Sequence, residues 1–347
     1  MAERNFLHHL QPTSVRRAVL HPLTTLGLGM ACLCTLAVLA VTGLTLFLYY
    51  QPDQQQAYER ILHISTALRF GGFVRDLHYL SGNLLLVFAA LHLTRVFLTG
   101  SYKGRRLNWF YGLGLFVLIL SANFTGYLLP WDQISYWAIQ VGASLADYFP
   151  LLGPWLKAVI LGGHEVGPET LLRSFALHAG GIPALMLVLV SLHLWRIRKD
   201  GGLGLPPQAA SERVPSSPAL YRAEAAVCFL SLALLLALTL VVDAPIHERA
   251  NPAHPPNPAK SPWYFVGFQE MLGYSVWFGG MLAPAILALF MALAPFADRS
   301  ASPPGLWFAK DRRLWNLAFL LLVLSQVAFI VLGQWFRGKN WALLWPF

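Results

Sequence analysis

Charged residues are scarce in this sequence. Asp, Glu, Lys and Arg make up 12% of its 347 residues, about half the share of an average soluble protein. Hydrophobic residues make up 56% of the chain, and the mean hydropathy is +0.53. This composition excludes an ordinary soluble protein and indicates a chain that crosses a membrane several times.

Cysteine is also scarce. Cys32, Cys34 and Cys228 all fall in apolar runs, so we expect no disulfide framework and assign Cys32 and Cys34 to packing. The absence of a Cys-x-x-Cys-His motif excludes the usual attachment of a c-type haem. Arg16 and Arg17 precede a first apolar run that is too long for the core of a cleavable signal peptide, so we expect no such peptide.

Seven apolar runs are long enough to cross a bilayer. They lie at about residues 23–50, 75–98, 109–129, 171–197, 222–242, 277–297 and 314–336. The connection at 130–170 has only short apolar pieces, which predict helices lying in the interface. The predicted fold is an all-α membrane protein: a four-helix haem-binding bundle at 1–199, a Pro/Ser/Gly-rich linker at 200–219 and a three-span C-terminal part at 220–347.

Basic residues predict the orientation of the chain. The net charge of +9 does not indicate nucleic-acid binding, because most Lys and Arg residues, among them Arg4, Arg16 and Arg17, fall on the side of the N-terminus. The positive-inside rule then predicts a cytoplasmic N-terminus and an external C-terminus.

Two of the predicted helices carry histidine pairs. His78 and His92 are 14 residues apart, and His178 and His193 are 15 apart. On a helix, 14 residues return to nearly the same face and separate two rings by about 21 Å. A single intramembrane histidine often only hydrogen-bonds to a neighbouring helix. Four at matched spacings favour two haem irons, each ligated from both sides. One shared zinc site is excluded, since four ligands would have to converge within about 2.3 Å of the metal.

Glycine pairs repeat the histidine spacing. Gly29 and Gly43 on the first span, and Gly112 and Gly126 on the third, are also 14 residues apart. Any one pair is typical of close helix packing in membranes. Two pairs at this spacing favour the flat approach of a porphyrin to bare backbone at both haem levels. Pro183 is expected to kink the fourth span and help to reconcile its 15-residue spacing with 14 on its partner.

These features, together with Gly126-Tyr127-Leu128-Leu129-Pro130-Trp131-Asp132-Gln133 and Pro262-Trp263-Tyr264, extend over nearly the whole chain. The sequence resembles cytochrome b of the quinol-oxidising bc and bf complexes. The longer histidine spacing on the fourth span and the seven spans resemble the chloroplast and Gram-positive branch. In that branch the four-span and three-span parts are often separate chains, whereas here they look fused.

The resemblance implies roles for individual residues. His78 and His178 would ligate an outer b-type haem, and His92 and His193 an inner one. Arg75 would lie near an outer propionate. Arg105 and Arg106 would do the same inside, although a solvated turn is an equally good interpretation. The outer quinol site would be lined by residues 126–138 and 262–264, with Trp263, Tyr264 and Asp132 as catalytic residues. The inner quinone site would lie near the start of the first span and Arg198-Lys199-Asp200.

Two departures from the family pattern stand out. The family's outer loop usually reads Pro-Glu-Trp-Tyr, with the Glu taking a quinol proton, but Ser261 and Pro262 precede Trp263 here. Gly27 stands about where the chloroplast branch has a cysteine that binds an additional haem. The residues that we consider as substitutes for the missing Glu are Asp132, Asp243, Glu248, Glu270, His247 and His254.

The resemblance also implies partners: a Rieske iron–sulfur protein, a cytochrome c-type subunit, quinone, lipid and a second copy of the complex, in a bacterial-type inner membrane. The expected activity is quinol:acceptor oxidoreduction. Two alternatives stay open. One is a dihaem membrane anchor of another oxidoreductase without a Rieske partner, and the other is a proton-coupled transporter with histidine relays.

Overall fold

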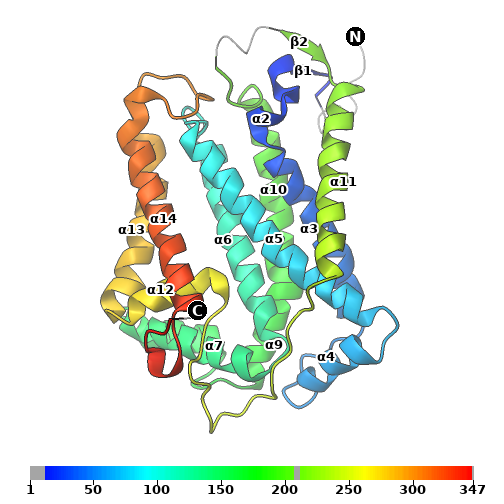
Figure 1. Ribbon diagram of the computed structural model, residues 1–347, viewed down its shortest axis with the longest axis vertical. Coiled ribbons are helices and arrows are strands. Elements are labelled where there is room, and N and C mark those ends of the chain that lie inside the picture. Colours follow the sequence, from blue (N-terminus) through cyan, green and yellow to red (C-terminus); the bar gives the residue numbers. More distant parts are fainter. Residues whose placement is uncertain (1–11, 207–211, 346–347) are drawn as a thin grey trace.

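Seven long helices form the body of the protein. The computed structural model describes residues 12–206 and 212–345, and the predictions for Arg4 and for part of the linker lie outside them. The helices long and apolar enough to span a membrane are Leu28–Phe47, Gly71–Leu98, Arg106–Leu128, Pro168–Lys199, Ala219–Thr239, Phe278–Ala297 and Lys310–Trp335. The prediction of a seven-span, mainly helical membrane protein is confirmed (Figure 1).

The first four spans form a bundle. α3 (Leu28–Phe47) packs against α5 (Gly71–Leu98), and α6 (Arg106–Leu128) packs against both α5 and the fourth span. The fourth span comprises α9 (Pro168–Ala176), a π-helical turn at Leu177–Gly181 and α10 (Ile182–Lys199). This arrangement leaves α5 and the fourth span to carry all four predicted ligands.

The π-helical turn explains the unequal histidine spacing. It contains His178 and ends two residues before Pro183, which cannot donate a backbone hydrogen bond. A π turn adds one residue to a helical turn, so the fifteenth residue on the fourth span is absorbed there. A second π turn, Phe278–Leu282, likewise precedes Pro284 and α13 (Ala283–Ala297).

The last three spans divide around the bundle. α11 (Ala219–Thr239) packs against α3 and α5, whereas α13 contacts α6 on the opposite side (Figure 1). α14 (Arg313–Trp335), after a 3-10 turn at Lys310–Arg312, packs against α12 (Trp263–Leu272). The C-terminal part therefore contacts the bundle on two opposite sides.

Short elements close the two ends of the bundle. At one end lie a 3-10 turn at Arg17–Leu20, α2 (Pro22–Thr25) and the antiparallel pair β1 (Ser14–Arg16) and β2 (Arg213–Pro215). The strand pair joins the N-terminal segment to the end of the linker, which sequence analysis did not anticipate. At the other end lie α4 (Ala57–Thr66), α7 (Gln133–Ser144), a 3-10 turn at Leu145–Tyr148, α8 (Gly153–Leu161) and a 3-10 turn at Lys339–Trp341. The short helices predicted within 130–170 are confirmed.

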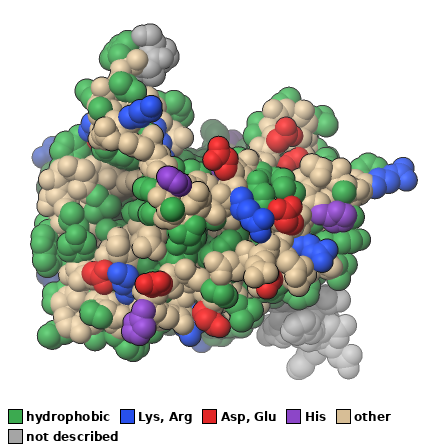
Figure 2. All heavy atoms as spheres, turned by 90° about the horizontal axis from the view of Figure 1, so that it is seen from below, with side chains coloured by type: hydrophobic (Ala, Val, Ile, Leu, Met, Phe, Trp, Pro, Cys, Tyr) green, Lys and Arg blue, Asp and Glu red, His purple; other side chains and the backbone are tan. Residues whose placement is uncertain are grey.

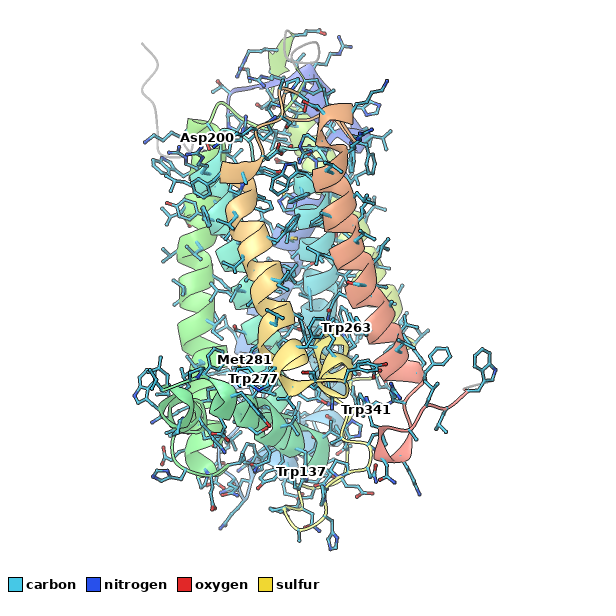
Figure 3. The ribbon with its side chains drawn as sticks, turned by 90° about the vertical axis from the view of Figure 1, so that its left-hand side faces the viewer. Trp137, Asp200, Trp263, Trp277, Met281 and Trp341 are labelled. Carbon is cyan, nitrogen blue, oxygen red and sulfur yellow. A yellow bond between two sulfur atoms is a disulfide. The ribbon has the colours of Figure 1, made fainter. Side chains whose placement is uncertain are left out.

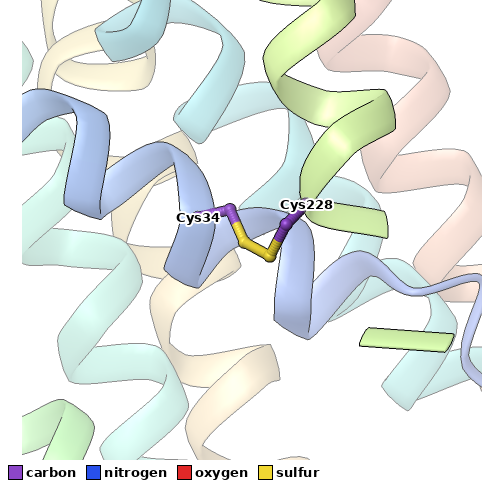
Figure 4. The surroundings of a disulfide bond; sticks show 2 residues. All are labelled: Cys34 and Cys228. Atoms are coloured by element: carbon purple, nitrogen blue, oxygen red, sulfur yellow. A yellow bond between two sulfur atoms is a disulfide. The ribbon is translucent and has the colours of Figure 1, made fainter. Parts of the chain in front are cut away.

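The expectation that disulfides are absent, with Cys34 serving only in packing, is wrong. Cys34 of α3 and Cys228 of α11 form a disulfide, with their Cα atoms 5.6 Å apart (Figure 4). Cys32 is free and half-buried. The two bonded cysteines are 194 residues apart, and only the packing of α11 on α3 brings them together. The disulfide therefore ties the four-span part to the three-span part.

Several tryptophans lie near the end of the molecule that holds α7 and α12. Trp137, Trp263, Trp277 and Trp341 gather towards the end that holds α7 and α12, and Asp200 lies at the other end (Figure 3). Tryptophan is enriched at membrane interfaces, which favours a position of this end near one surface of the bilayer. Acidic, basic and histidine side chains are interspersed over the face beyond it, as expected of a surface in water (Figure 2).

Candidate functional site: two stacked histidine pairs

The four intramembrane histidines meet in two pairs. The ring centres of His78 and His178 lie 6.0 Å apart, and those of His92 and His193 lie 6.5 Å apart. The two rings of each pair are nearly perpendicular, at 78° and 80°. α5 supplies one ring of each pair and the fourth span the other, so the pairs are stacked along the bundle.

The spacing of the rings fits a metal held between two imidazoles. A metal–imidazole bond is about 2.0 Å long and a ring nitrogen lies about 1.2 Å from the ring centre, so two axial imidazoles have centres about 6.4 Å apart. Both observed separations agree with this value. Among the described residues, no group of three or more His, Cys, Asp or Glu lies close enough together to hold a metal.

The tautomers of His78 and His178, called the outer pair here after the orientation expected from the sequence, follow from their hydrogen bonds. Thr42 Oγ1 donates its hydrogen to the carbonyl of Val38 and lies 2.8 Å from His78 Nδ1, so the ring donates to the hydroxyl. His178 Nδ1 donates to the carbonyl of Ala122, 2.9 Å away. With both Nδ1 atoms protonated, each Nε2 keeps the lone pair that a metal requires.

The inner pair is held differently. Nδ1 of His92 is buried and has no hydrogen-bond partner in the described part of the chain, whereas the His193 ring lies against the backbone of Asn108. Sequence analysis missed Thr42, yet a signal was present: threonine directly precedes both outer glycines, as Thr42-Gly43 and Thr125-Gly126, and neither inner one.

Each predicted glycine lies against a histidine ring of the neighbouring helix. A Cβ at Gly43 would be 3.1 Å from His78, and one at Gly126 would be 2.5 Å from His178. At the inner level the corresponding distances are 3.5 Å for Gly29 to His92 and 3.6 Å for Gly112 to His193. The four glycines thus lie at the levels of the two histidine pairs and clear space for the imidazoles, while their contact with a porphyrin stays a prediction.

Two buried arginines bracket the pairs on α5. Arg75 Nη1 and Nη2 donate to the carbonyls of Ala244 and Pro245, at 2.9 and 2.6 Å. Arg95 Nε and Nη2 both donate to the carbonyl of Thr24, at 3.0 and 2.6 Å. Within the described residues neither forms an ion pair, although they are only 9% and 5% exposed. Buried cations bonded only to neutral groups suit an anionic ligand such as a haem carboxylate.

Sequence analysis singled out Arg75 but overlooked Arg95. Arg75 stands three residues before His78, and Arg95 three residues after His92, so the symmetry was readable. The predicted inner residues have other contacts. Arg105 donates to the carbonyl of Gly202, whereas Arg106 donates to that of Pro295 and stacks on Phe296 of α13.

The predicted outer-site aromatics lie at the start of α12. Trp263 Nε1 donates to Asn83 Oδ1 of α5 at 2.6 Å, and the Trp263 and Tyr264 rings touch edge to face. Both pack against the apolar interior formed by α5, α6 and α10. Burial raises the pKa of Tyr264, so its hydroxyl stays protonated and serves as a donor. Sequence analysis did not identify Asn83, which holds the Trp263 indole in place.

The carboxylate of Asp132 hydrogen-bonds to the backbone of two segments. Its Oδ1 accepts from the backbone of Ser135 and caps α7, and its Oδ2 accepts from the backbone of His247. This bonding joins α7 to the loop before α12 and gives each oxygen of Asp132 a structural partner, while its assignment as a catalytic residue stays a prediction. The other buried candidate, Glu270, is fully engaged by Arg337 and Trp341. The remaining candidates are exposed loop residues: Asp243, His247, Glu248 and His254.

At the inner end, Gly27 begins α3 in a left-handed conformation. A Cβ there would be 2.7 Å from Val227 of α11, so the position that resembles a haem-binding cysteine is closed by a packed side chain. Asp200 pairs with Arg196 at 3.0 Å. Two cavities lie at the ends of the molecule, one of about 450 Å³ beside Arg106 and one of about 370 Å³ beside Trp131 and Arg249.

Fold and site together define a class: a seven-span membrane protein whose bundle presents two stacked imidazole pairs at metal-binding distance. A family model described as Cytochrome b/b6/petB matches residues 18–201. The chain belongs to this cytochrome b/b6 family, and the resemblance read from the sequence is confirmed.

Individual relatives extend the comparison. The chain is 41% identical over 175 residues to a cytochrome b6 of Heliobacterium mobile, covering 50% of this chain and 82% of the relative. It is 39% identical over 163 residues to a menaquinol:cytochrome c reductase cytochrome b subunit of Geobacillus thermodenitrificans, covering 46% and 73%.

Two further similarities reach into the C-terminal part. A cytochrome bc complex cytochrome b subunit of Chlorobaculum thiosulfatiphilum is 34% identical over 272 residues, which is 76% of this chain and 63% of the relative. A chain of a hyperthermophilic respiratory Complex III structure superposes with a TM-score of 0.79 at 26% identity, covering 93% of this chain and 85% of that one. The four-span and three-span parts thus form one fused chain.

Proposed function

We propose that the chain is the cytochrome b subunit of a quinol-oxidising complex of the bc/bf type and that it binds two b-type haems. The observation that carries the proposal is the pair of histidine couples, 6.0 and 6.5 Å between ring centres, stacked within one membrane bundle. Such a haem, when bound, supplies a reversible one-electron couple at an iron with no open position.

The chain's own residues would orient and tune the groups they hold. Nε2 of His78 and His178 would bind the outer iron, and Nε2 of His92 and His193 the inner one. Arg75 and Arg95 would receive haem carboxylates, because each is a buried cation without an acidic partner among the described residues. The two levels would divide the crossing of an electron into two short steps through the low-dielectric layer.

Quinol oxidation would take place beside Trp263 and Tyr264. Asn83 fixes the Trp263 indole, and the protonated Tyr264 hydroxyl offers a hydrogen bond to a quinol oxygen. Both oxygens of each buried carboxylate in this region, Asp132 and Glu270, already accept hydrogen bonds. We therefore assign proton release to the exposed titratable side chains of the 243–262 loop.

The remaining assignments complete the proposal. The end with α7 and α12 faces outward, the N-terminus is cytoplasmic, and quinone is reduced near the inner pair. A Rieske protein and a cytochrome c-type subunit would take the other electron, within a dimeric complex of a bacterial-type inner membrane. The division into 1–199, 200–219 and 220–347 belongs to this proposal.

Single-ligand variants test the two-haem assignment. His92→Leu should lose the inner haem and His78→Leu the outer one, so each purified variant should hold one haem per chain instead of two. The pyridine haemochrome assay and a redox titration measure this. Loss of both haems in each folded variant, or retention of both, would contradict the pairing. A wild-type protein without a reduced α-band would instead favour the transporter alternative.

The dihaem anchor without a Rieske partner remains the second candidate, because the outer site lacks a free buried carboxylate in the described chain. Stopped-flow mixing of the complex with quinol and an oxidant separates the two. A burst of extra haem reduction on adding oxidant, abolished by an outer-site inhibitor, is expected only for bifurcated oxidation.

A further inference from the structure

A cavity of about 450 Å³ opens at the cytoplasmic end assigned above, where α6 begins and where α10 and α13 end. It is lined by Lys103, Gly104, Arg106, Leu107, Arg196, Pro295 and Asp298. This cavity is separate from the histidine pairs and from the outer aromatic site. Its lining contains three basic side chains and one acidic one.

Two of these cations form no ion pair in the described residues, although the exposed carboxylate of Asp311 acts on Lys103 from further away. Lys103 Nζ donates only to neutral groups, the carbonyls of Ser300 and Ser302 and the Ser300 hydroxyl, at 2.5 to 2.8 Å. Arg106 donates to the carbonyl of Pro295 at 3.3 Å and stacks on Phe296. The third cation, Arg196, is balanced by Asp200.

The one carboxylate in the lining does not neutralise them. Asp298 accepts hydrogen bonds from Tyr102, Arg312 and Ser300, and its side chain is fully buried against Arg312. Burial alone would raise the pKa of Asp298, but the hydrogen bonds from Ser300, Tyr102 and Arg312 lower it to about 2. The cavity therefore keeps a net positive charge at neutral pH.

The surroundings select the class of anion. Arg106 is the first residue of a membrane-spanning helix, so the cavity lies at headgroup depth. Directly below it, Leu107 and Phe110 of α6 and Leu293 and Phe296 of α13 are exposed, and the two phenylalanine rings lie 6.0 Å apart. A phosphate with acyl chains would satisfy both the cations and this apolar strip, whereas a free phosphate would use only the cations.

We propose that Arg106 binds the phosphate of an anionic phospholipid, with the positive charge of Lys103 beside it, and that the acyl chains lie along the exposed apolar side chains of α6 and α13. Basic pockets between transmembrane helices on the cytoplasmic side are suited to such headgroups. The lipid would seal the contact between the four-helix bundle and α13.

Native mass spectrometry of the delipidated full-length protein in neutral detergent tests this. Phosphatidylglycerol, phosphatidylcholine of the same chain length and inorganic phosphate are titrated separately. Wild type should bind phosphatidylglycerol at least fivefold more tightly than phosphatidylcholine. Lys103→Gln and Arg106→Gln should each weaken phosphatidylglycerol binding about fivefold, with phosphatidylcholine unchanged.

Arg313→Gln, which removes an exposed charge from the start of α14 at the same end, is the matched control and should bind as wild type does. Equal losses in Arg313→Gln would overturn the site, and equal affinities for the two lipids would overturn the headgroup assignment. If inorganic phosphate binds as tightly as phosphatidylglycerol, the site binds a free anion and the lipid assignment is overturned. Since Lys103 also holds the Ser300–Ser302 turn, Arg106→Gln keeps the test decisive if Lys103→Gln fails to give a monodisperse protein.

Discussion

Gly126→Ala is the most discriminating single-atom test of the outer site. The new Cβ would lie 2.5 Å from Cε1 and 2.9 Å from Nδ1 of His178. Carbon atoms pack at about 3.5 Å or more, so the ring must retreat by about 1 Å. A ring held 2.9 Å from the Ala122 carbonyl and placed for an axial bond cannot move that far without losing one of the two contacts.

The expected cost follows from overpacking. Inserting a methyl group into a packed site costs about 1–3 kcal/mol. If this cost falls on the haem-bound state, outer-haem affinity drops about 5- to 160-fold. Haem retained per chain after dilution, with a two-component redox titration, measures the loss.

The other glycines provide a graded control. Gly112→Ala places its Cβ 3.6 Å from His193, an ordinary contact, and should leave both haems in place. Gly43→Ala, at 3.1 Å from His78, should be intermediate. Equal haem content and equal midpoint potentials in all three variants would refute the argument that these glycines make room for the imidazoles.

Three further outcomes are expected. Arg337→Leu should lower the free energy of unfolding by about 3–5 kcal/mol, because it leaves the fully buried carboxylate of Glu270 without its cation. The loss should be seen as a lower Tm in detergent. An unchanged Tm would mean that the ion pair does not stabilise the protein. When the chain is cut at a protease site placed in the linker, the two fragments should migrate together on a non-reducing gel. In Cys34→Ser, which lacks the disulfide to Cys228, they should separate. Separation of the fragments without this substitution would disprove the disulfide. Trp263→Phe, which removes the indole hydrogen bond, should raise KM for quinol several-fold while haem content stays at the wild-type value, and a loss of haem instead would place Trp263 outside the quinol site.

Local sequence patterns were enough to predict the membrane spans and the levels of the paired histidines. The seven spans follow from hydropathy, since lipid admits only long apolar helices. The levels of His78, His92, Gly29 and Gly43 follow from helical periodicity, because 14 residues return to nearly the same face. Even Arg95 was readable from its mirror-image spacing to Arg75.

The remaining features depended on how distant segments pack. The Cys34–Cys228 bond, the β1–β2 pair and the split of α11 from α13 and α14 join residues far apart in the chain, and no local pattern encodes such contacts. The bonding of Asp132 shows the same limit, because its second oxygen meets a backbone N–H 115 residues away. The helical periodicity of the sequence determines which side chains of each helix face the interior of the bundle. Tertiary structure decided which of them remain free to bind a ligand, because that depends on whether another part of the chain already satisfies their hydrogen bonds.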